Sequence, residues 1–258
     1  MLTALRASKR TTIRASHARR EDGPFVCPDC DEQVDLHHGR NTIPHFAHRS
    51  TRICTHTTGE TDLHRKSKIE IYEALKKAPE VDRVEMEFSI GYVRADILAR
   101  IRGELVAIEV QISTLSPESI SFRTQEYRRR GIAVLWILEW TPKIEGLHFT
   151  PRPFERWLHA TYFGRVYYWK SGLEIIPYQF QPRHIHVEPR TWYDKKGRQQ
   201  RSAGFVRVAR RRRIAIRGRP LNLVQDFQST TRPPWQSETL RIPEARLYLD
   251  SRTDFLRG

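Results

Sequence analysis

The sequence predicts an α/β protein whose central domain has the element order helix, three strands, helix, strand. One segment carries apolar residues at the spacing of an amphipathic helix, a second has the cap and first-turn residues of a helix, and four short segments have the residue pattern of strands. The chain has 258 residues, of which 38% are hydrophobic. This length and composition allow one large domain or two small ones with a buried core, and they disfavour a disordered or fibrous chain.

Each element of this order has its own signal. The first helix is predicted over 60–77, where the charges lie off the apolar face, and Pro79 ends it. The second helix, over 117–131, has Ser116 as its cap. The strands are predicted, in chain order, over residues 81–90, 92–101, 104–113 and 132–138.

A hairpin between the second and third strands sets the relation of two acidic residues. If Arg102 and Gly103 form its two-residue loop, Asp96 lies directly opposite Glu109. A four-residue loop keeps this pairing, whereas a three-residue loop shifts it by one residue. Because strand side chains alternate between the two faces, Asp96, Glu109 and Gln111 then share one face of the sheet.

Two opposed carboxylates repel one another unless a proton, a cation or solvent lies between them. Carboxylate and carbonyl oxygens are the ligands that Mg²⁺ and Mn²⁺ prefer. Asp96, Glu109 and the backbone carbonyl of Val110 are therefore candidate ligands of a catalytic ion that hydrolyses phosphodiester bonds. The alternative is that both acids pair with cations such as Arg94 or Arg100.

The first helix carries a polar stripe that bears on the same site. Glu60, His64 and Lys68 lie four residues apart and share one face. If this face looks toward the acidic pair, it supplies a metal ligand, a base and a cation to a catalytic site. The alternative is an ordinary solvated helix face.

Metal-binding residue types are crowded into residues 23–56, a stretch too short to build a core alone. Cys27 and Cys30 form a CxxC motif, and the HFAH segment offers His45 and His48. Two thiolates and two imidazoles satisfy tetrahedral Zn²⁺, so we expect a structural zinc module. The alternative is two buried cysteines and surface histidines without a metal. Further candidate ligands lie nearby, namely His37, His38, Cys54 and His56.

The chain is strongly basic, with 45 Lys and Arg against 30 Asp and Glu and a formal net charge of +15. This excess favours an anionic partner such as nucleic acid. Two clusters are candidate phosphate contacts: Arg128, Arg129 and Arg130, and Arg210, Arg211, Arg212 and Arg213. Nearby aromatic residues favour single-stranded or branched DNA, because they can stack on unpaired bases. Either cluster taken alone is also compatible with a plain solvated surface.

The longest apolar run, residues 132–138, is too short to span a membrane. The first residues lack an apolar stretch of signal-peptide length, and three cysteines argue against a disulfide framework. We therefore expect a cytoplasmic protein. Its predicted division is a solvated basic tail over 1–22, the zinc module over 23–56, the central domain over 57–140 and a basic α+β extension over 141–258.

The motifs CPDC, HFAH, YVRADIL, AIEVQIS, RTQEY and IAVLWIL occur in an order that resembles the PD-(D/E)XK nuclease core and, more narrowly, the competence protein CoiA family. The resemblance covers roughly residues 23–140. It implies a metal-dependent deoxyribonuclease linked to competence or DNA recombination, with recombination proteins as possible partners. It favours His45 and His48 as the zinc-binding histidines.

The same resemblance assigns roles to individual residues. It implies that Asp96 and Glu109 bind Mg²⁺ or Mn²⁺, and that Gln111 holds the position of the usual catalytic lysine. It also places Arg123 and Tyr127 at the spacing of a motif that contacts the DNA backbone in related nucleases. Glutamine cannot supply a positive charge. A catalytically weak or inactive DNA-binding recombination accessory is therefore the alternative function.

Overall fold

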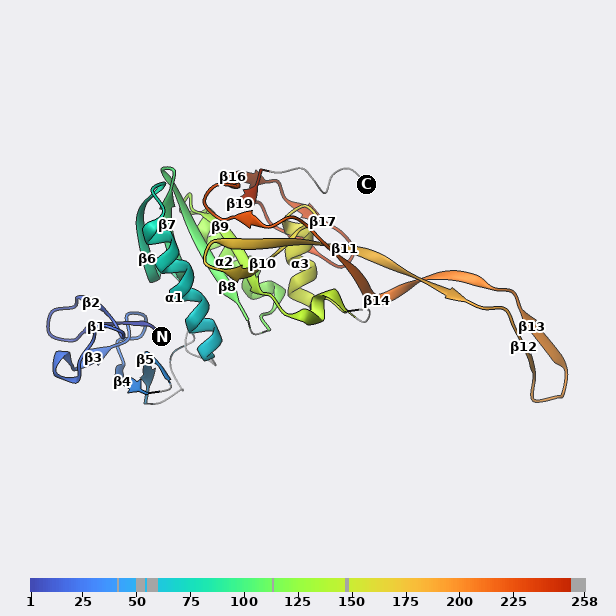
Figure 1. Cartoon of the computed structure of the whole chain (residues 1–258), viewed down its shortest axis with the longest axis horizontal. Coiled ribbons are helices and arrows are strands. Elements are labelled where there is room, and N and C mark those ends of the chain that lie inside the picture. The colour runs from blue at the N-terminus through green and yellow to red at the C-terminus, as the bar shows by residue number, and fades with distance from the viewer. Residues whose placement is uncertain (41, 50–53, 55–59, 113, 147–148, 252–258) are drawn as a thin grey trace.

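The computed structural model describes residues 1–258 except 41, 50–53, 55–59, 113, 147–148 and 252–258. Three parts follow one another along the molecule (Figure 1): an N-terminal unit, a central body built on one large sheet, and a long two-stranded arm. No helix in the described ranges is long and apolar enough to cross a membrane.

The N-terminal unit is a five-stranded sheet with the order β2-β1-β3-β4-β5. One 3₁₀ turn, Arg20–Asp22, lies between β2 and β3. The strands are β1 (Thr3–Arg6), β2 (Thr12–Arg14), β3 (Phe25–Val26), β4 (Gln33–Gly39) and β5 (Thr42–His48).

The predicted solvated tail over residues 1–22 is wrong. β1 pairs with both β2 and β3, and Leu2, Ala4 and Ile13 are buried. The apolar residues of this segment are few and are separated by basic ones, which hid the strands in the sequence. They are buried because short strands from both halves of the unit share one small core with Phe25.

The central domain has the predicted order of a helix, three strands, a helix and a strand. Thr61 caps the first helix by accepting a hydrogen bond from the amide of His64 at 3.2 Å, and Ser116 caps the second in the same way through Ser119. The elements are α1 (Asp62–Lys77), β6 (Val81–Ile90), β7 (Val93–Ile101), β8 (Glu104–Gln111), α2 (Pro117–Arg128) and β9 (Ala133–Glu139).

The β7–β8 hairpin has the register that the sequence predicts. Ile101 pairs with Glu104, so the loop is the two residues Arg102 and Gly103, whose φ angles are 50° and 80°. Left-handed φ at both loop positions matches the twist of a tight hairpin. The ladder runs to the pair Ile97 and Ile108, one step before the two acids.

The C-terminal region is not a separate extension behind the core, because its strands complete the same ten-stranded sheet. β10 and β19 both pair with β9 in parallel, at different points along it, and α3 packs beside β10. The main path of the sheet is β14-β11-β10-β9-β8-β7-β6. The remaining elements of this region are a 3₁₀ turn (Pro142–Glu145), α3 (Pro153–Thr161), β10 (Val166–Ser171), β11 (Glu174–Val187), β14 (Phe205–Arg217), β15 (Leu221–Asn222), β16 (Phe227–Arg232), β17 (Trp235–Gln236), β18 (Arg241–Ile242) and β19 (Ala245–Asp250).

β11 and β14 continue beyond the sheet as a two-stranded ribbon that ends in a small hairpin, β12 (Arg190–Tyr193) with β13 (Gln199–Ser202). We call residues 182–213 the arm. It extends away from the body (Figure 1), whereas the apolar core lies between the large sheet and its helices.

Candidate functional site

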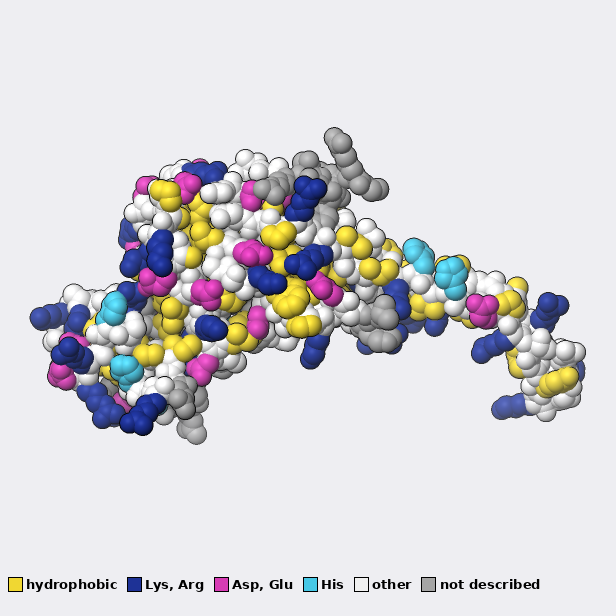
Figure 2. All heavy atoms as spheres, in the orientation of Figure 1, with side chains coloured by type: hydrophobic (Ala, Val, Ile, Leu, Met, Phe, Trp, Pro, Cys, Tyr) yellow, Lys and Arg dark blue, Asp and Glu magenta, His cyan; other side chains and the backbone are white. Residues whose placement is uncertain are grey.

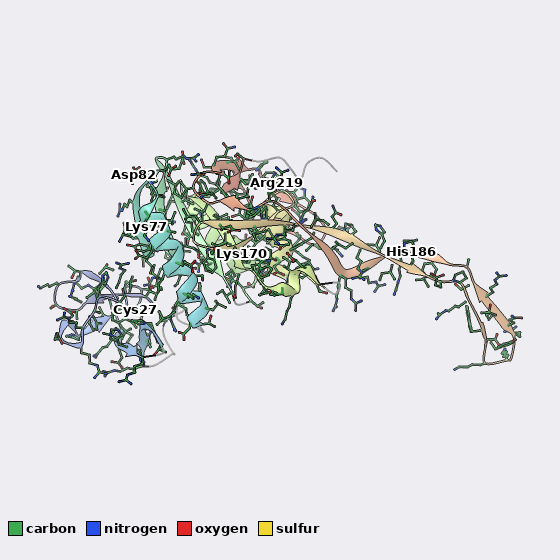
Figure 3. All side chains as sticks on the ribbon, viewed as in Figure 1. Cys27, Lys77, Asp82, Lys170, His186 and Arg219 are labelled. Carbon is green, nitrogen blue, oxygen red and sulfur yellow. The ribbon has the colours of Figure 1, made fainter. Side chains whose placement is uncertain are left out.

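Three cysteines and one histidine converge in the N-terminal unit, where Figure 3 labels Cys27. The Sγ atoms of Cys27 and Cys54 are 3.9 Å apart, and the Sγ atom of Cys30 is 3.2 Å from Nε2 of His48. The four ligand atoms all lie within 4.8 Å of one another. In the described part of the chain, this is the one place where three or more such side chains meet so closely.

The cluster contains three of the four predicted zinc ligands, with Cys54 in the place of His45. His45 lies opposite His37 in the β4–β5 ladder, the two rings stack 5.1 Å apart, and its Nδ1 is 2.9 Å from the carbonyl oxygen of Ile43. His45 and His48 are three residues apart on one strand, so they face opposite sides of it. The HxxH spacing therefore cannot place both rings at one ion here.

The donors suit a metal ion. Burial raises the pKa of Cys27 to about 12, so its thiol stays protonated unless a cation stabilises the thiolate. Nδ1 of His48 is buried and has no hydrogen-bond partner in the described structure. A Cys₃His set is a usual closed tetrahedral site, which supports a fold and leaves no position for substrate. These four residues could hold a structural metal ion.

Asp96 lies where β7 and β8 separate. Its Oδ2 accepts a hydrogen bond from the amide of Val110 at 3.0 Å. Two residues of α1 reach the same carboxylate, His64 with Nε2 at 3.3 Å and Lys68 with Nζ at 3.4 Å. Burial alone would raise the pKa of Asp96, but the nearby charges of Lys68 and His64 hold it well below its usual value. The polar face of the first helix does turn toward Asp96.

Lys68 is buried among carboxylates, in contact with Glu60 and 2.7 Å from Oε1 of Glu87. Glu87 also accepts hydrogen bonds from the amides of Leu2 and Thr3 at 2.8 and 3.0 Å. Burial works to raise the pKa of Glu87, and Lys68 together with other cations lowers it overall. Glu87 therefore stays ionised and holds the lysine next to Asp96.

Sequence reasoning did not single out Glu87, which is one of three acids within residues 81–90. Two signals mark it in the structure. Its φ of 52° interrupts the regular strand, and Arg94 donates from Nη2 to its carboxylate at 2.9 Å. Arg94 also bridges to Asp29, between the two CxxC cysteines, at 2.9 Å. A chain of buried ion pairs thus links the cysteine cluster to the acidic site.

Glu109 is contacted from the other helix, α2. Nη2 of Arg123 lies 2.5 Å from both carboxylate oxygens, and the hydroxyl of Tyr127 donates a hydrogen bond to one of them. Burial raises the pKa of Glu109, Arg123 opposes this, and the charge of Asp96 raises it further. Ile97 pairs with Ile108, so Asp96 and Glu109 lie at adjoining positions on β7 and β8, each one residue beyond that pair.

Two models of one family match the chain: the N-terminal domain of competence protein CoiA over residues 7–57, and its nuclease-like domain over residues 60–158. The chain belongs to the CoiA family. Competence protein CoiA of Bacillus subtilis (strain 168) is 30% identical over 115 residues, which make up 44% of this chain and 31% of that protein. The match thus spans about a third of the length of that curated relative. No solved structure matches the chain.

The nuclease-like domain of this CoiA-family chain contains both acids and both helices that contact them. Tyr127 is fully buried against Glu109, so its side chain is not exposed where we expected it to contact a DNA backbone. Arg123, its expected companion, neutralises Glu109 in this structure and stacks over Trp136 at 5.5 Å.

The first arginine cluster is largely neutralised by the protein itself. Arg128 lies 2.5 Å from Glu244, and both Arg129 and Arg130 pair with Glu126. This leaves the cluster little free positive charge for phosphates.

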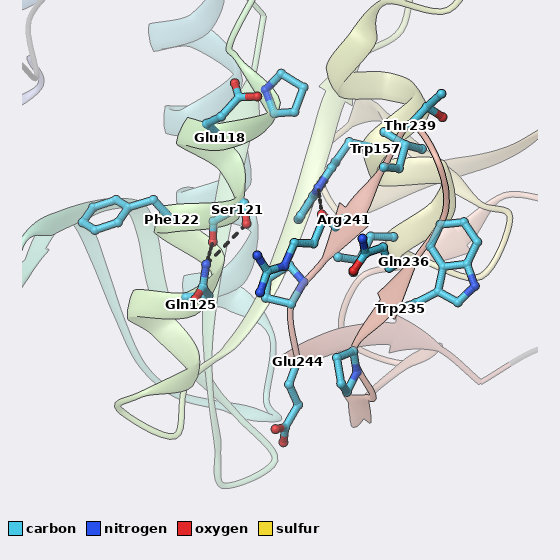
Figure 4. Close-up of a pocket in the computed structure, with 15 residues that line it drawn as sticks. Glu118, Ser121, Phe122, Gln125, Trp157, Trp235, Gln236, Thr239, Arg241 and Glu244 are labelled. Carbon is cyan, nitrogen blue, oxygen red and sulfur yellow. Dashed lines mark hydrogen bonds between the residues drawn. The ribbon is translucent and has the colours of Figure 1, made fainter.

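Two cavities have lining residues in the CoiA nuclease-like domain, and neither is lined by Asp96 or Glu109. Gln111 lines one of about 730 Å³ at the ends of β8 and β9, together with Glu139 and Arg152. The larger, about 820 Å³, lies between the outer face of α2 and the β17–β18 hairpin, where Phe122 and Trp235 are exposed (Figure 4). Neither concentrates basic side chains, so neither looks like the main contact surface for an anionic polymer.

Proposed function

We propose that this chain is a metal-dependent deoxyribonuclease of the PD-(D/E)XK type that acts in competence or DNA recombination. The observation that carries the proposal is the β7–β8 register, in which Ile97 pairs with Ile108, so that Asp96 and Glu109 each lie one residue beyond this pair within one nuclease-like domain. The element order around them, α1-β6-β7-β8-α2-β9 with four adjacent strands, agrees with that nuclease core. The family name supports a role in competence.

Asp96 and Glu109 would hold Mg²⁺ or Mn²⁺, since carboxylates on neighbouring strands are suitable oxygen ligands. The ion supplies Lewis-acid polarisation of the phosphate and a more acidic water. His64 is part-exposed beside Asp96, and in its neutral form it would be the candidate base for that water. Lys68 is a positioning residue that orients Asp96. It also supplies the positive charge that neutral Gln111 cannot supply at the position of the usual lysine.

Arg123 has two roles in this proposal. In the structure it neutralises Glu109, and about a quarter of its side chain is exposed (24%). When Glu109 binds an ion, the guanidinium is free to donate to phosphate oxygens, for which its planar fork is well suited. Arg123 thus keeps the acid ready without substrate and contacts the backbone when DNA is bound.

We further propose that the Cys27, Cys30, His48 and Cys54 cluster holds zinc as a structural ion. Thiolate-rich tetrahedral donors favour Zn²⁺, and the small N-terminal core gains from a cross-link. No disulfide joins the three cysteines, which suits the reducing cytoplasm.

The alternative function is a DNA-binding recombination accessory without catalysis. The specific observation in its favour is that both oxygens of Glu109 are occupied by Arg123 and Tyr127, while neutral Gln111 holds the expected lysine position. In that case the acids serve only to stabilise the fold, and DNA recombination proteins are its partners.

A cleavage assay separates the two functions. Purified protein is incubated with labelled single-stranded, duplex and branched DNA, with Mg²⁺ or Mn²⁺ or with neither. We expect ion-dependent cleavage that falls about 100-fold or more in Asp96→Asn and in Glu109→Gln, because an ion contributes several kcal/mol to the transition state. The matched controls are Asp82→Asn and Glu118→Gln, which change exposed acids. Binding without cleavage by the unmodified protein would instead support the accessory.

A further inference from the structure

The arm is the most basic part of the molecule. Residues 182–213 contain eleven Lys and Arg against two acids, a net charge of +9 out of the +15 of the whole chain. Figure 2 shows dark blue side chains along the arm and at its tip. The rest of the chain is seven times longer and carries only +6. The positive charge is therefore concentrated on one protruding element.

Apart from Arg198, which pairs with Asp194, and Arg213, which donates to backbone carbonyls, these cations form no ion pair or hydrogen bond within the described structure that would hold the fold. All residues of the arm are described, and among them Arg198 with Asp194 is the one ion pair. Ala209 is the one buried residue in the same range. Solvated side chains that serve no packing or pairing role within the molecule are available to a partner, and their common charge indicates a polyanion.

The β14 strand contains a bulge that presents three arginines outward. Val208 pairs with His184 and Arg213 pairs with Pro182, so residues 209–212 lie opposite a single residue of β11. Nη1 of Arg213 donates to the carbonyl oxygens of Ala209 and Arg212 at 3.2 and 3.0 Å, which holds the bulge closed. The side chains of Arg210, Arg211 and Arg212 are exposed.

Cations project from both faces of the ribbon. In the tip hairpin Arg190 pairs with Ser202 and Thr191 pairs with Arg201, so the two arginines occupy neighbouring pairs and opposite faces. Arg190 stacks over Trp192 two residues along, which confirms that these two share a face. An element that lies flat on a surface needs charge on one face only. Charge on both faces suits an element with phosphates on either side.

We propose that the arm binds double-stranded DNA by entering its major groove. The groove of B-form DNA admits a two-stranded β-ribbon and has a phosphate backbone along each wall. The corresponding groove of duplex RNA is too narrow for side-chain access, and a single strand offers no groove. This inference rests on the proposed DNA-directed function and adds to it a second contact on the arm, where Figure 3 labels His186, outside the central body.

The test measures binding without cleavage, by fluorescence anisotropy at several salt concentrations in Asp96→Asn protein with no added Mg²⁺ or Mn²⁺. For duplex DNA we expect R210A/R211A/R212A to raise Kd at least about tenfold and to reduce the slope of log K against log salt by about 3, because each phosphate contact contributes about 0.9. The matched control K9A/K66A/K77A removes the same charge from exposed body positions and is expected to change Kd less than threefold.

Two further variants test whether the arm enters the groove. R190A and R201A, from opposite faces of the ribbon, are each expected to weaken duplex binding and to lower the slope by about 1. An effect of only one of them would contradict insertion into a groove. Equal losses in the arm and body triple variants, or tighter binding of single-stranded DNA or duplex RNA, would overturn the proposal. These outcomes are independent of cleavage, so they leave the nuclease proposal to its own assay.

Discussion

Replacing Cys54 with serine is expected to abolish zinc binding, whereas replacing His45 with alanine is expected to leave one zinc ion per chain. The reason is geometric, because Cys54 lies 3.9 Å from Cys27 while His45 faces the other side of its strand. Structural zinc sites contribute an apparent free energy of about 10–16 kcal/mol near neutral pH, so the loss of one ligand has a large effect. Elemental analysis of the purified variants measures it.

The N-terminal unit is expected to lose its structure with the metal. Its core is small, and units of this size usually need a metal or disulfides. Limited proteolysis of Cys54→Ser should cut within residues 1–48 and leave the central body intact. His37→Ala, which alters the stacking partner of His45, is the matched control. If Cys54→Ser retained zinc and His45→Ala lost it, the cluster with Cys54 would be contradicted. The zinc ligands would then be those that the sequence predicted, with His45 in place of Cys54.

Replacing Lys68 with methionine is expected to destabilise the protein by about 3–5 kcal/mol, because it leaves buried carboxylates without their shared cation. Lys68 lies 2.7 Å from Glu87 and 3.4 Å from Asp96, and only 3% of its side chain is exposed. Urea unfolding measures the change. Lys66→Met, two residues away and exposed, is the control and should stay within about 0.5 kcal/mol.

Two measurements distinguish this ion network from simple loss of packing. Adding Glu87→Gln to Lys68→Met should restore part of the stability, because it removes one of the unpaired charges. The pH dependence should also change. Glu87 and Asp96 have folded pKa values below their ordinary values near 4, so they contribute stability above pH 4 that is lost as the pH falls further. This acid-induced loss should be weaker in Lys68→Met. A loss unaffected by pH or by Glu87→Gln would argue against the network.

The local features of the site could be predicted from the sequence, because short-range rules determine them. The two-residue loop at Arg102 and Gly103 fixes the strand register as far as the pair Ile97 and Ile108, which adjoins Asp96 and Glu109. Helical spacing likewise puts His64 and Lys68 on one face, which the structure turns toward Asp96. These inferences needed no knowledge of distant contacts.

The features that sequence reasoning missed depend on contacts between distant segments. Glu87 is buried only because the first strand and α1 both pack on it, 19 or more residues away in the chain. Cys54 replaces His45 because its Sγ atom lies 3.9 Å from that of Cys27, whereas strand parity turns His45 away. Tyr127 is buried and donates a hydrogen bond to Glu109 because α2 packs on the sheet.

The central claim is that Asp96 and Glu109 together bind one divalent cation, and Mn²⁺ binding to the zinc-loaded protein tests it most directly. Electron paramagnetic resonance counts free and bound Mn²⁺ without requiring DNA or cleavage. We expect one bound ion per chain in the unmodified protein and in Asp82→Asn, and none in Asp96→Asn or Glu109→Gln. Absence of binding in the unmodified protein, or equal binding in all four, would contradict the claim and leave the ion-paired acids with a structural role.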